Sequence, residues 1–190
     1  PVPPRIRFPL AALLGANAVY VAAEFGTVGV RRNRIRRLAD EGHWLARRLL
    51  PHIDSPSALD RYVGVSQVGI TLSSLILGAV GQGLVAVALG SWLTATFGLE
   101  ARVGANTAAI VVLLLLTAAN VVLSELIPKS IALRYPTEVA LATVLPMRWS
   151  LAAFKPLILL LNGSATGLLK LLGVNLSGHR HLHSPDEIAL

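Results

Sequence analysis

Oxygen-bearing side chains lie inside three long apolar stretches of this sequence, where a polar group is expensive and needs a reason. In the first stretch Asn17 and Glu24 are seven residues apart, so they share one face of a helix. The other two stretches carry denser sets: Ser66, Gln67, Thr71, Ser73 and Ser74 in the second, and Thr117, Asn120, Ser124 and Glu125 in the third. Three helices that each present a polar stripe can converge on one hydrophilic cavity, which is the arrangement the pattern predicts.

The side chains of this set offer hydroxyl, amide and carboxylate oxygens but no thiol, because the chain has no cysteine. Hard oxygen ligands suit Mg²⁺, Ca²⁺ or Na⁺ rather than zinc or copper. Any single Ser or Thr in a membrane helix can instead bond to a carbonyl of its own helix or allow close packing. The cluster as a whole, rather than any one hydroxyl, therefore favours a cation site.

The segment from Glu125 to Lys129 is the sharpest feature. Pro128 has no amide donor and disturbs the preceding turn, which frees carbonyls around residue 124. Freed carbonyls beside the Glu125 carboxylate can bind a cation, as in the broken helices of transporters. Alternatively, Pro128 simply ends the helix and Lys129 extends to the membrane interface. The residues alone leave both interpretations open.

The composition indicates what positions these residues. Of 190 residues 54% are hydrophobic and only 14% are charged, against about 25% charged in soluble domains. Stretches at about 8–30, 62–81 and 104–127 are long enough to cross a membrane, so we expect an all-α membrane protein with three transmembrane helices. The apolar residues continue past the second stretch to Trp92, and we expect glycines 78, 81 and 83 to mark its outer end, followed by a short second piece.

Two regions outside the crossings mix charged and apolar residues. Residues 31–61 carry eight arginines with leucines at near-helical spacing, which predicts amphipathic juxtamembrane helices at the headgroups. Residues 137–174 are interpreted in the same way. A fourth crossing at about 139–161 would contain Arg148 and Lys155, and placing each of them in the bilayer would cost about 2.5 to 3.5 kcal/mol. Residues 175–190 read as a polar cytoplasmic linker in which Ser184 begins a helix, as if further cytoplasmic domains followed.

The basic residues set the expected orientation and the expected partner. Fourteen of the 17 lie in residues 31–61 or from Lys129 onward, and three lie elsewhere, which places the N-terminus outside and the C-terminus in the cytoplasm. The net charge of +7 is expected to meet anionic headgroups of the bilayer rather than nucleic acid. No HExxH or GxSxG motif occurs in the sequence, so no enzyme is expected.

Three segments together resemble a known family: NAVYVAAEFGTVGV from Asn17, SQVGITLSSLILG from Ser66 and VVLSELIPKSIALRYP from Val121. In order and spacing they look like the transmembrane domain of the CorC/cyclin-M (CNNM) magnesium transporter family, over residues 1–174. The resemblance implies a homodimer in the bacterial plasma (inner) membrane. It also implies that a pair of nucleotide-binding CBS domains follows the transmembrane domain.

Carried over onto this chain, the family's cation site maps to Asn17, Thr71, Ser74, Ser124 and Glu125, followed by the helix-breaking Pro128 and Lys129. The resemblance implies export of a divalent cation, Mg²⁺, in exchange for Na⁺. The chain departs from the serine-bearing members of the family at Val21 and Ala23, and from their glycine at Ser124. Two alternatives therefore stay open: export of another cation such as a polyamine, with Glu24 and Glu125 as counter-ions, or a membrane sensor or scaffold that transports nothing.

Overall fold

The computed structural model describes residues 4–98 and 100–171. Every element within these residues is a helix, and none of them forms a strand. Three helical stretches there are long and apolar enough to cross a membrane: Phe8–Gly29, Pro56–Phe97 and Ala101–Arg134. The predicted all-α class with three transmembrane helices is thus confirmed. The chain divides into two compact units, one ending at Ala152 and one beginning at Ala153.

The first crossing is α1 (Pro4–Gly29), which packs along α4, α7 and η2. Its buried face carries Asn17, Val21 and Ala23 in its middle and Gly26 near its end. A Cβ added at Gly26 would lie only 3.0 Å from Val139 Cγ1. The glycine therefore permits the close approach between α1 and the beginning of α8.

The second crossing is longer than predicted and does not end at the glycines. The π-helical η1 (Gly81–Ala86) joins α4 (Pro56–Val80) to α5 (Val87–Phe97) without interruption. Gly81 keeps helical dihedrals and packs against the side chain of Leu116. The helix ends only at Gly98, whose φ of 62° is left-handed. A membrane explains the difference, because a helix end there would leave backbone groups without hydrogen-bond partners.

The third crossing also continues past its expected end at Pro128. It consists of α6 (Ala101–Ala119), the π-helical η2 (Asn120–Leu126) and α7 (Ile127–Arg134). Proline cannot donate to the carbonyl four residues earlier, and the π-helical turns lie directly before it. Pro128 therefore alters the hydrogen bonding of the helix without ending it. Such π-helical insertions are frequent at functional sites.

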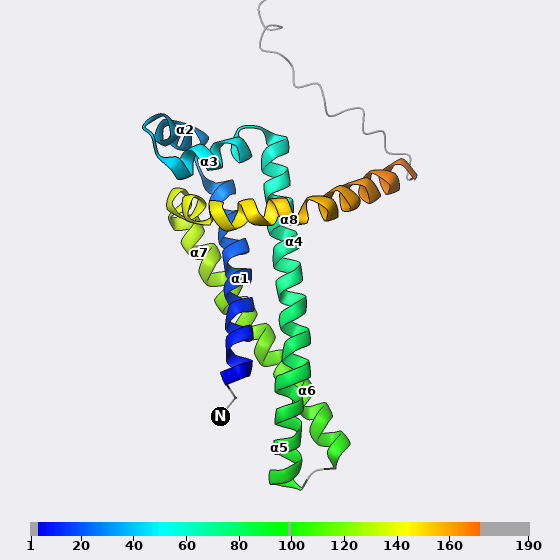
Figure 1. The fold of residues 1–190 in the computed structure, drawn as a ribbon. Helices are drawn as coiled ribbons and strands as arrows, with labels where there is room; N and C mark the ends of the chain where they lie inside the picture. The colour runs from blue at the N-terminus through cyan, green and yellow to red at the C-terminus, as the bar shows by residue number, and fades with distance from the viewer. Residues whose placement is uncertain (1–3, 99, 172–190) are drawn as a thin grey trace, which may run out of the picture. The chain divides into compact units, whose positions relative to one another are not determined.

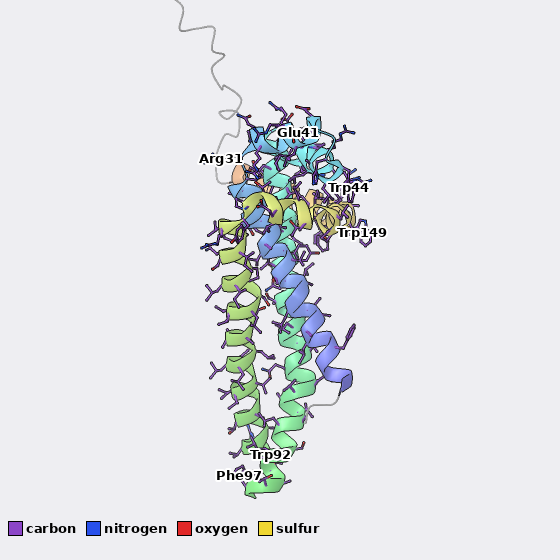
Figure 2. The ribbon with its side chains drawn as sticks, turned by 90° about the vertical axis from the view of Figure 1, so that its left-hand side faces the viewer. Arg31, Glu41, Trp44, Trp92, Phe97 and Trp149 are labelled. Carbon is purple, nitrogen blue, oxygen red and sulfur yellow. The ribbon has the colours of Figure 1, made fainter. Side chains whose placement is uncertain are left out.

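Two short amphipathic helices follow α1. Helices α2 (Arg32–Asp40) and α3 (Trp44–Ile53) bury Ile35, Leu49 and Ile53 while their arginines stay exposed. Together with the first residues of α8 they form one end of the bundle, here called the basic end, and the α5–α6 turn forms the other (Figure 1). Tryptophans mark both ends, with Trp44 at the basic end and Trp92 beside the α5–α6 turn (Figure 2), as in the aromatic belts of membrane proteins.

The last described element is α8 (Pro136–Leu171), a single helix of 36 residues in place of several. Within the first unit its residues Ala140, Val144 and Met147 are buried, and Ser150 Oγ lies 2.8 Å from the Tyr20 hydroxyl. Among the described residues α8 is not one of the stretches apolar enough to cross a membrane. The expected linker at 175–190 lies outside the described residues.

Candidate functional site

A layer of hydrogen-bonded polar side chains lies between the three crossings. Asn17 of α1, fully buried, donates from Nδ2 to Asn120 Oδ1 at 2.9 Å. Ser73 of α4 donates to Asn17 Oδ1 at 3.1 Å, and Asn120 Nδ2 donates to Ser74 Oγ at 3.3 Å. We call these four side chains, together with the buried Ser124, the polar layer. One amide from each of two helices and two hydroxyls from the third thus form a continuous chain of contacts.

The local structure of each helix aims these groups at one another. Ser73 also donates to the carbonyl of Gly69 at 2.7 Å, which fixes its hydroxyl on the buried face of α4. Gly69 itself lets α1 come close, because a Cβ there would lie 2.5 Å from a ring carbon of Tyr20. In η2, Ser124 donates to the backbone carbonyl of Leu14 at 3.0 Å. The third crossing is therefore bonded to α1 at two levels, through Asn120 and through Ser124.

Glu125 is the carboxylate next to the polar layer. It is half-buried, directly follows Ser124 and makes no hydrogen bond or ion pair within the described part of the chain. The carboxylate of Glu24, in contrast, lies near the side chains of Gln67 and Lys129. Glu125 is the carboxylate that directly follows the polar layer along the chain, so we take it as the carboxylate that adjoins the layer.

The ammonium group of Lys129 contacts an aromatic ring of α1. Its Nζ lies 4.6 Å from the centre of the Phe25 ring, within the range of a cation–π interaction. Pro128, one residue earlier, is buried against the bundle. The Pro-Lys pair thus fastens the end of the π-helical segment to α1 on the side that carries Phe25.

The residues expected from the sequence divide into two groups. Asn17, Ser74 and Ser124 lie in the polar layer, and Glu125 adjoins it. Thr71 does not join them, because it is exposed on α4 and donates to the Gln67 carbonyl of its own helix at 2.9 Å.

Two members of the layer, Ser73 and Asn120, were absent from the expected site. Each belongs to a polar stripe that is visible in the sequence. The sequence does not tell which of the adjacent hydroxyls at 73 and 74 reaches the site, because that depends on which face of the helix meets α1. The four-residue spacing from Asn120 to Ser124 was the signal that could have found Asn120.

A cavity of about 180 Å³ opens beside the layer, between α4, η1 and α6. Ser74, Gln82, Thr117 and Asn120 supply its polar lining. A water takes about 30 Å³ of liquid volume, so the cavity has room for several waters. A cation that reaches Asn120 and Ser74 from this side can keep part of its hydration.

The donor set consists mostly of neutral oxygens. No group of three or more His, Cys, Asp or Glu side chains able to hold a metal occurs among the described residues. What the layer offers is amide and hydroxyl oxygens with one carboxylate alongside, a set that suits a hard cation. In the observed arrangement the oxygens of Asn17, Asn120 and Ser74 accept hydrogen bonds from neighbouring amide and hydroxyl groups, so a cation that binds here must replace those hydrogen bonds.

Comparison with known proteins gives a consistent family. The model of the cyclin M transmembrane N-terminal domain matches residues 9–190. The UPF0053 protein YugS of Bacillus subtilis is 34% identical over 179 residues, covering 94% of this chain and 41% of the relative. The uncharacterized protein Rv1841c of Mycobacterium tuberculosis is 35% identical over 166 residues, covering 85% of this chain and 45% of the relative.

A more distant relative has a functional name. The polyamine export protein of Haemophilus influenzae is 26% identical over 181 residues, covering 95% of this chain and 41% of that protein. In each of these three pairs the chain spans less than half of the relative, between 41% and 45% of its length.

Proposed function

The chain belongs to the cyclin M (CNNM) transmembrane-domain family, and on this premise we propose that it exports a cation across the membrane, with Mg²⁺ as the leading substrate. The observation that carries the proposal is the polar layer: buried and half-buried amide and hydroxyl groups from all three crossings, joined by hydrogen bonds of 2.9 to 3.3 Å. Polar groups at such depth are costly and mark ion pathways.

The chemistry of the layer explains how a cation would be handled. Asn17 would turn its amide oxygen from the Ser73 hydroxyl toward the ion, and Asn120 would turn its amide oxygen from the Asn17 amide in the same way. Glu125 would supply negative charge. Mg²⁺ loses its water reluctantly and usually keeps several water ligands, and the adjoining cavity of about 180 Å³ can hold them. Because binding competes with the hydrogen bonds that join the three crossings, occupation of the site loosens their contact. That is the coupling an alternating-access transporter needs.

Orientation, location and assembly are further parts of the proposal. The excess of basic residues near the basic end supports a cytoplasmic position for that end of a plasma-membrane protein. The homodimer, the coupling to Na⁺ and the nucleotide-binding CBS domains come from the family resemblance.

The orientation can be tested directly because the chain has no cysteine of its own. Ser57 and Thr96 are both exposed, at the basic end and beside the α5–α6 turn. In intact cells Thr96→Cys should react with an impermeant thiol reagent, and Ser57→Cys should react only after the cells are opened. Reaction of Ser57→Cys in intact cells would reverse the proposed orientation.

A polyamine is the second candidate substrate, and two observations favour it. One relative is named a polyamine export protein. In addition, the ammonium group of Lys129 lies 4.6 Å from the centre of the Phe25 ring, which is an example within the bundle of an amine cation bound by an aromatic ring. A polyamine would use Glu24 and Glu125 as separate counter-ions and would need no compact shell of ligands.

Flux from reconstituted vesicles tests both candidates. The purified protein is placed in vesicles, and Mg²⁺ and radiolabelled spermidine fluxes are measured with and without a Na⁺ gradient. Mg²⁺ flux that Glu125→Gln abolishes and Ser91→Ala leaves intact would support the proposal, since the Ser91 hydroxyl is exposed and bonds only to its own helix. Spermidine flux alone would favour the second candidate, and flux of neither would leave the sensor or scaffold interpretation.

A further inference from the structure

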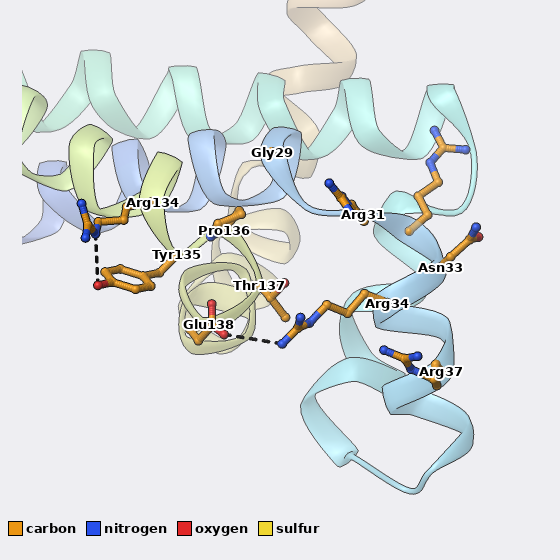
Figure 3. A pocket seen from close by; sticks show the side chains of 11 residues that line it. Gly29, Arg31, Asn33, Arg34, Arg37, Arg134, Tyr135, Pro136, Thr137 and Glu138 are labelled. Atoms are coloured by element: carbon orange, nitrogen blue, oxygen red, sulfur yellow. Dashed lines mark hydrogen bonds and ion pairs between the residues drawn. The ribbon is translucent and has the colours of Figure 1, made fainter.

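A large arginine-lined pocket lies at the basic end, well away from the polar layer. Its volume is about 770 Å³, and it forms where α1 and α7 end and α2 and α8 begin. Its charged lining consists of Arg31, Arg32, Arg34, Arg37, Arg134 and a single carboxylate, Glu138 (Figure 3). Five guanidinium groups against one carboxylate leave an excess of four positive charges around one cavity.

The ion pairs that these arginines make are long and exposed. Arg34 lies 3.9 Å from Glu138, with more than half of each side chain exposed. Arg37 lies 3.9 Å from Glu41 in an equally exposed pair. Such pairs contribute little to stability, so an anionic ligand can replace them at low cost. Arg31 takes part in none of the ion pairs found within the described ranges.

The backbone adds to this positive field. The first turns of both α2 and α8 line the pocket, and Arg31, which precedes α2, places no side-chain cap on its helix. The first amides of a helix lack partners within the helix and favour anions. Planar guanidinium groups match the oxygens of a phosphate in paired hydrogen bonds. The pocket therefore fits a ligand that carries phosphate groups.

The position of the pocket indicates which kind of molecule supplies the phosphate. The membrane-spanning stretches of α1 and α7 stop at Gly29 and Arg134, which are both lining residues. Trp44 and Trp149 are exposed at this same end of the bundle (Figure 2), and exposed tryptophans characterise the headgroup level of a membrane. We infer that the pocket binds the headgroup of an anionic phospholipid from the adjacent leaflet, with more than one phosphate charge. Basic pockets between membrane helices bind headgroups of this kind.

The test measures lipid binding by the purified protein in detergent, with fluorescent cardiolipin as the probe and phosphatidylcholine as the neutral lipid. The pocket variant is Arg31→Gln with Arg34→Gln. The matched control is Arg48→Gln with Arg61→Gln, which removes the same charge from exposed residues at the basic end outside the pocket. Each arginine is expected to contribute about 1 kcal/mol of binding free energy, so the pocket variant should bind cardiolipin about 30-fold more weakly than the native protein. The affinity of the control variant should stay within about threefold of the native value.

Several results would overturn the inference. An equal loss of cardiolipin affinity in the two double variants would mean that the lipid responds only to the overall surface charge. Equal binding of cardiolipin and phosphatidylcholine would remove any role for phosphate charge, and tight binding of inorganic pyrophosphate without binding of cardiolipin would identify a soluble anion. If the pocket variant fails to fold, the single Arg31→Gln variant replaces it, with an expected loss of about fivefold.

Discussion

Replacing Asn17 by leucine removes the central amide of the polar layer while keeping the branched shape of the side chain. The substitution deletes two hydrogen bonds between crossings, the 2.9 Å bond to Asn120 and the 3.1 Å bond from Ser73. At about 0.6 kcal/mol for each bond in a membrane protein, their loss costs about 1 kcal/mol. Asn120 Oδ1 loses its donor, which adds about 1 to 3 kcal/mol, whereas Ser73 keeps its bond to Gly69.

The expected total of about 2 to 4 kcal/mol lies below the stability of a typical domain, so Asn17→Leu should still fold. Transport should suffer much more, because the proposed cation site would lose one of its oxygens, and we expect Mg²⁺ flux below saturation to fall at least about tenfold. Denaturant unfolding in detergent and flux in vesicles measure the two effects separately. Thr71→Ala breaks only a bond within α4 and should cost less than Asn17→Leu in both assays.

Native flux from Asn17→Leu, at equal reconstitution, would refute the assignment of the polar layer as the cation site. A loss of stability no greater than that of Thr71→Ala would refute the role of the layer in joining the crossings. A loss of flux by Ser91→Ala equal to that of Asn17→Leu would show that the assay reports damage to the protein rather than to the site.

Three further predictions concern other parts of the molecule. Burial and nearby arginines lower the pKa of His52 from its ordinary 6.5, so the unfolded chain takes up a proton at a higher pH than the folded chain. The free energy of unfolding should therefore fall as the pH drops from 7 through about 6.5. His52→Gln should reduce this fall when unfolding is measured as a function of pH. Gly69→Ala places a methyl group 2.5 Å from a ring carbon of Tyr20 and should cost about 1 to 3 kcal/mol in the same assay, whereas Gly64→Ala, with nothing within 4 Å, should cost almost nothing. Val21 is buried one turn beyond Asn17, so Val21→Ser adds an oxygen near the layer and should tighten Mg²⁺ binding in calorimetry; unchanged binding would show that Val21 does not face the ion.

The sequence predicts the three crossings because uninterrupted apolar length is a strong signal. It does not predict where the second and third crossings end. Glycine and proline end helices in water, where solvent can satisfy the freed backbone groups. Inside a membrane no solvent is present, and the chain stays helical through Gly81 and Pro128 by changing to π-helical bonding. The usual signals for helix ends regain their meaning at Gly98, beyond the apolar stretch.

The sequence predicts the kind of site, a cluster of polar side chains between the crossings, but only some of the residues that form it. Periodicity shows that α4 has a polar side, but the face that meets α1 is set by the contact of Gly69 with Tyr20. That contact turns Ser73 inward and leaves Thr71 exposed, although the two are only two positions apart. Asn120 lies at the start of the π-helical segment, and its four-residue spacing from Ser124 was the signal in the sequence for its place in the layer.

The polar layer and the arginine-lined pocket share structural elements, which gives the two sites a means of influencing each other. Helix α1 carries Asn17 in the layer and ends at Gly29 in the pocket, and the third crossing runs from Ser124 to Arg134 in the same way. In the proposed mechanism, a headgroup held between the ends of α1 and α7 would restrain the two helices that separate when a cation replaces the bonds of the layer. Coupling of this kind is reciprocal: if cardiolipin changes the affinity for the transported cation by some factor, that cation must change the affinity for cardiolipin by the same factor. If cardiolipin and the cation leave each other's affinity unchanged, the pocket only anchors the protein in the membrane.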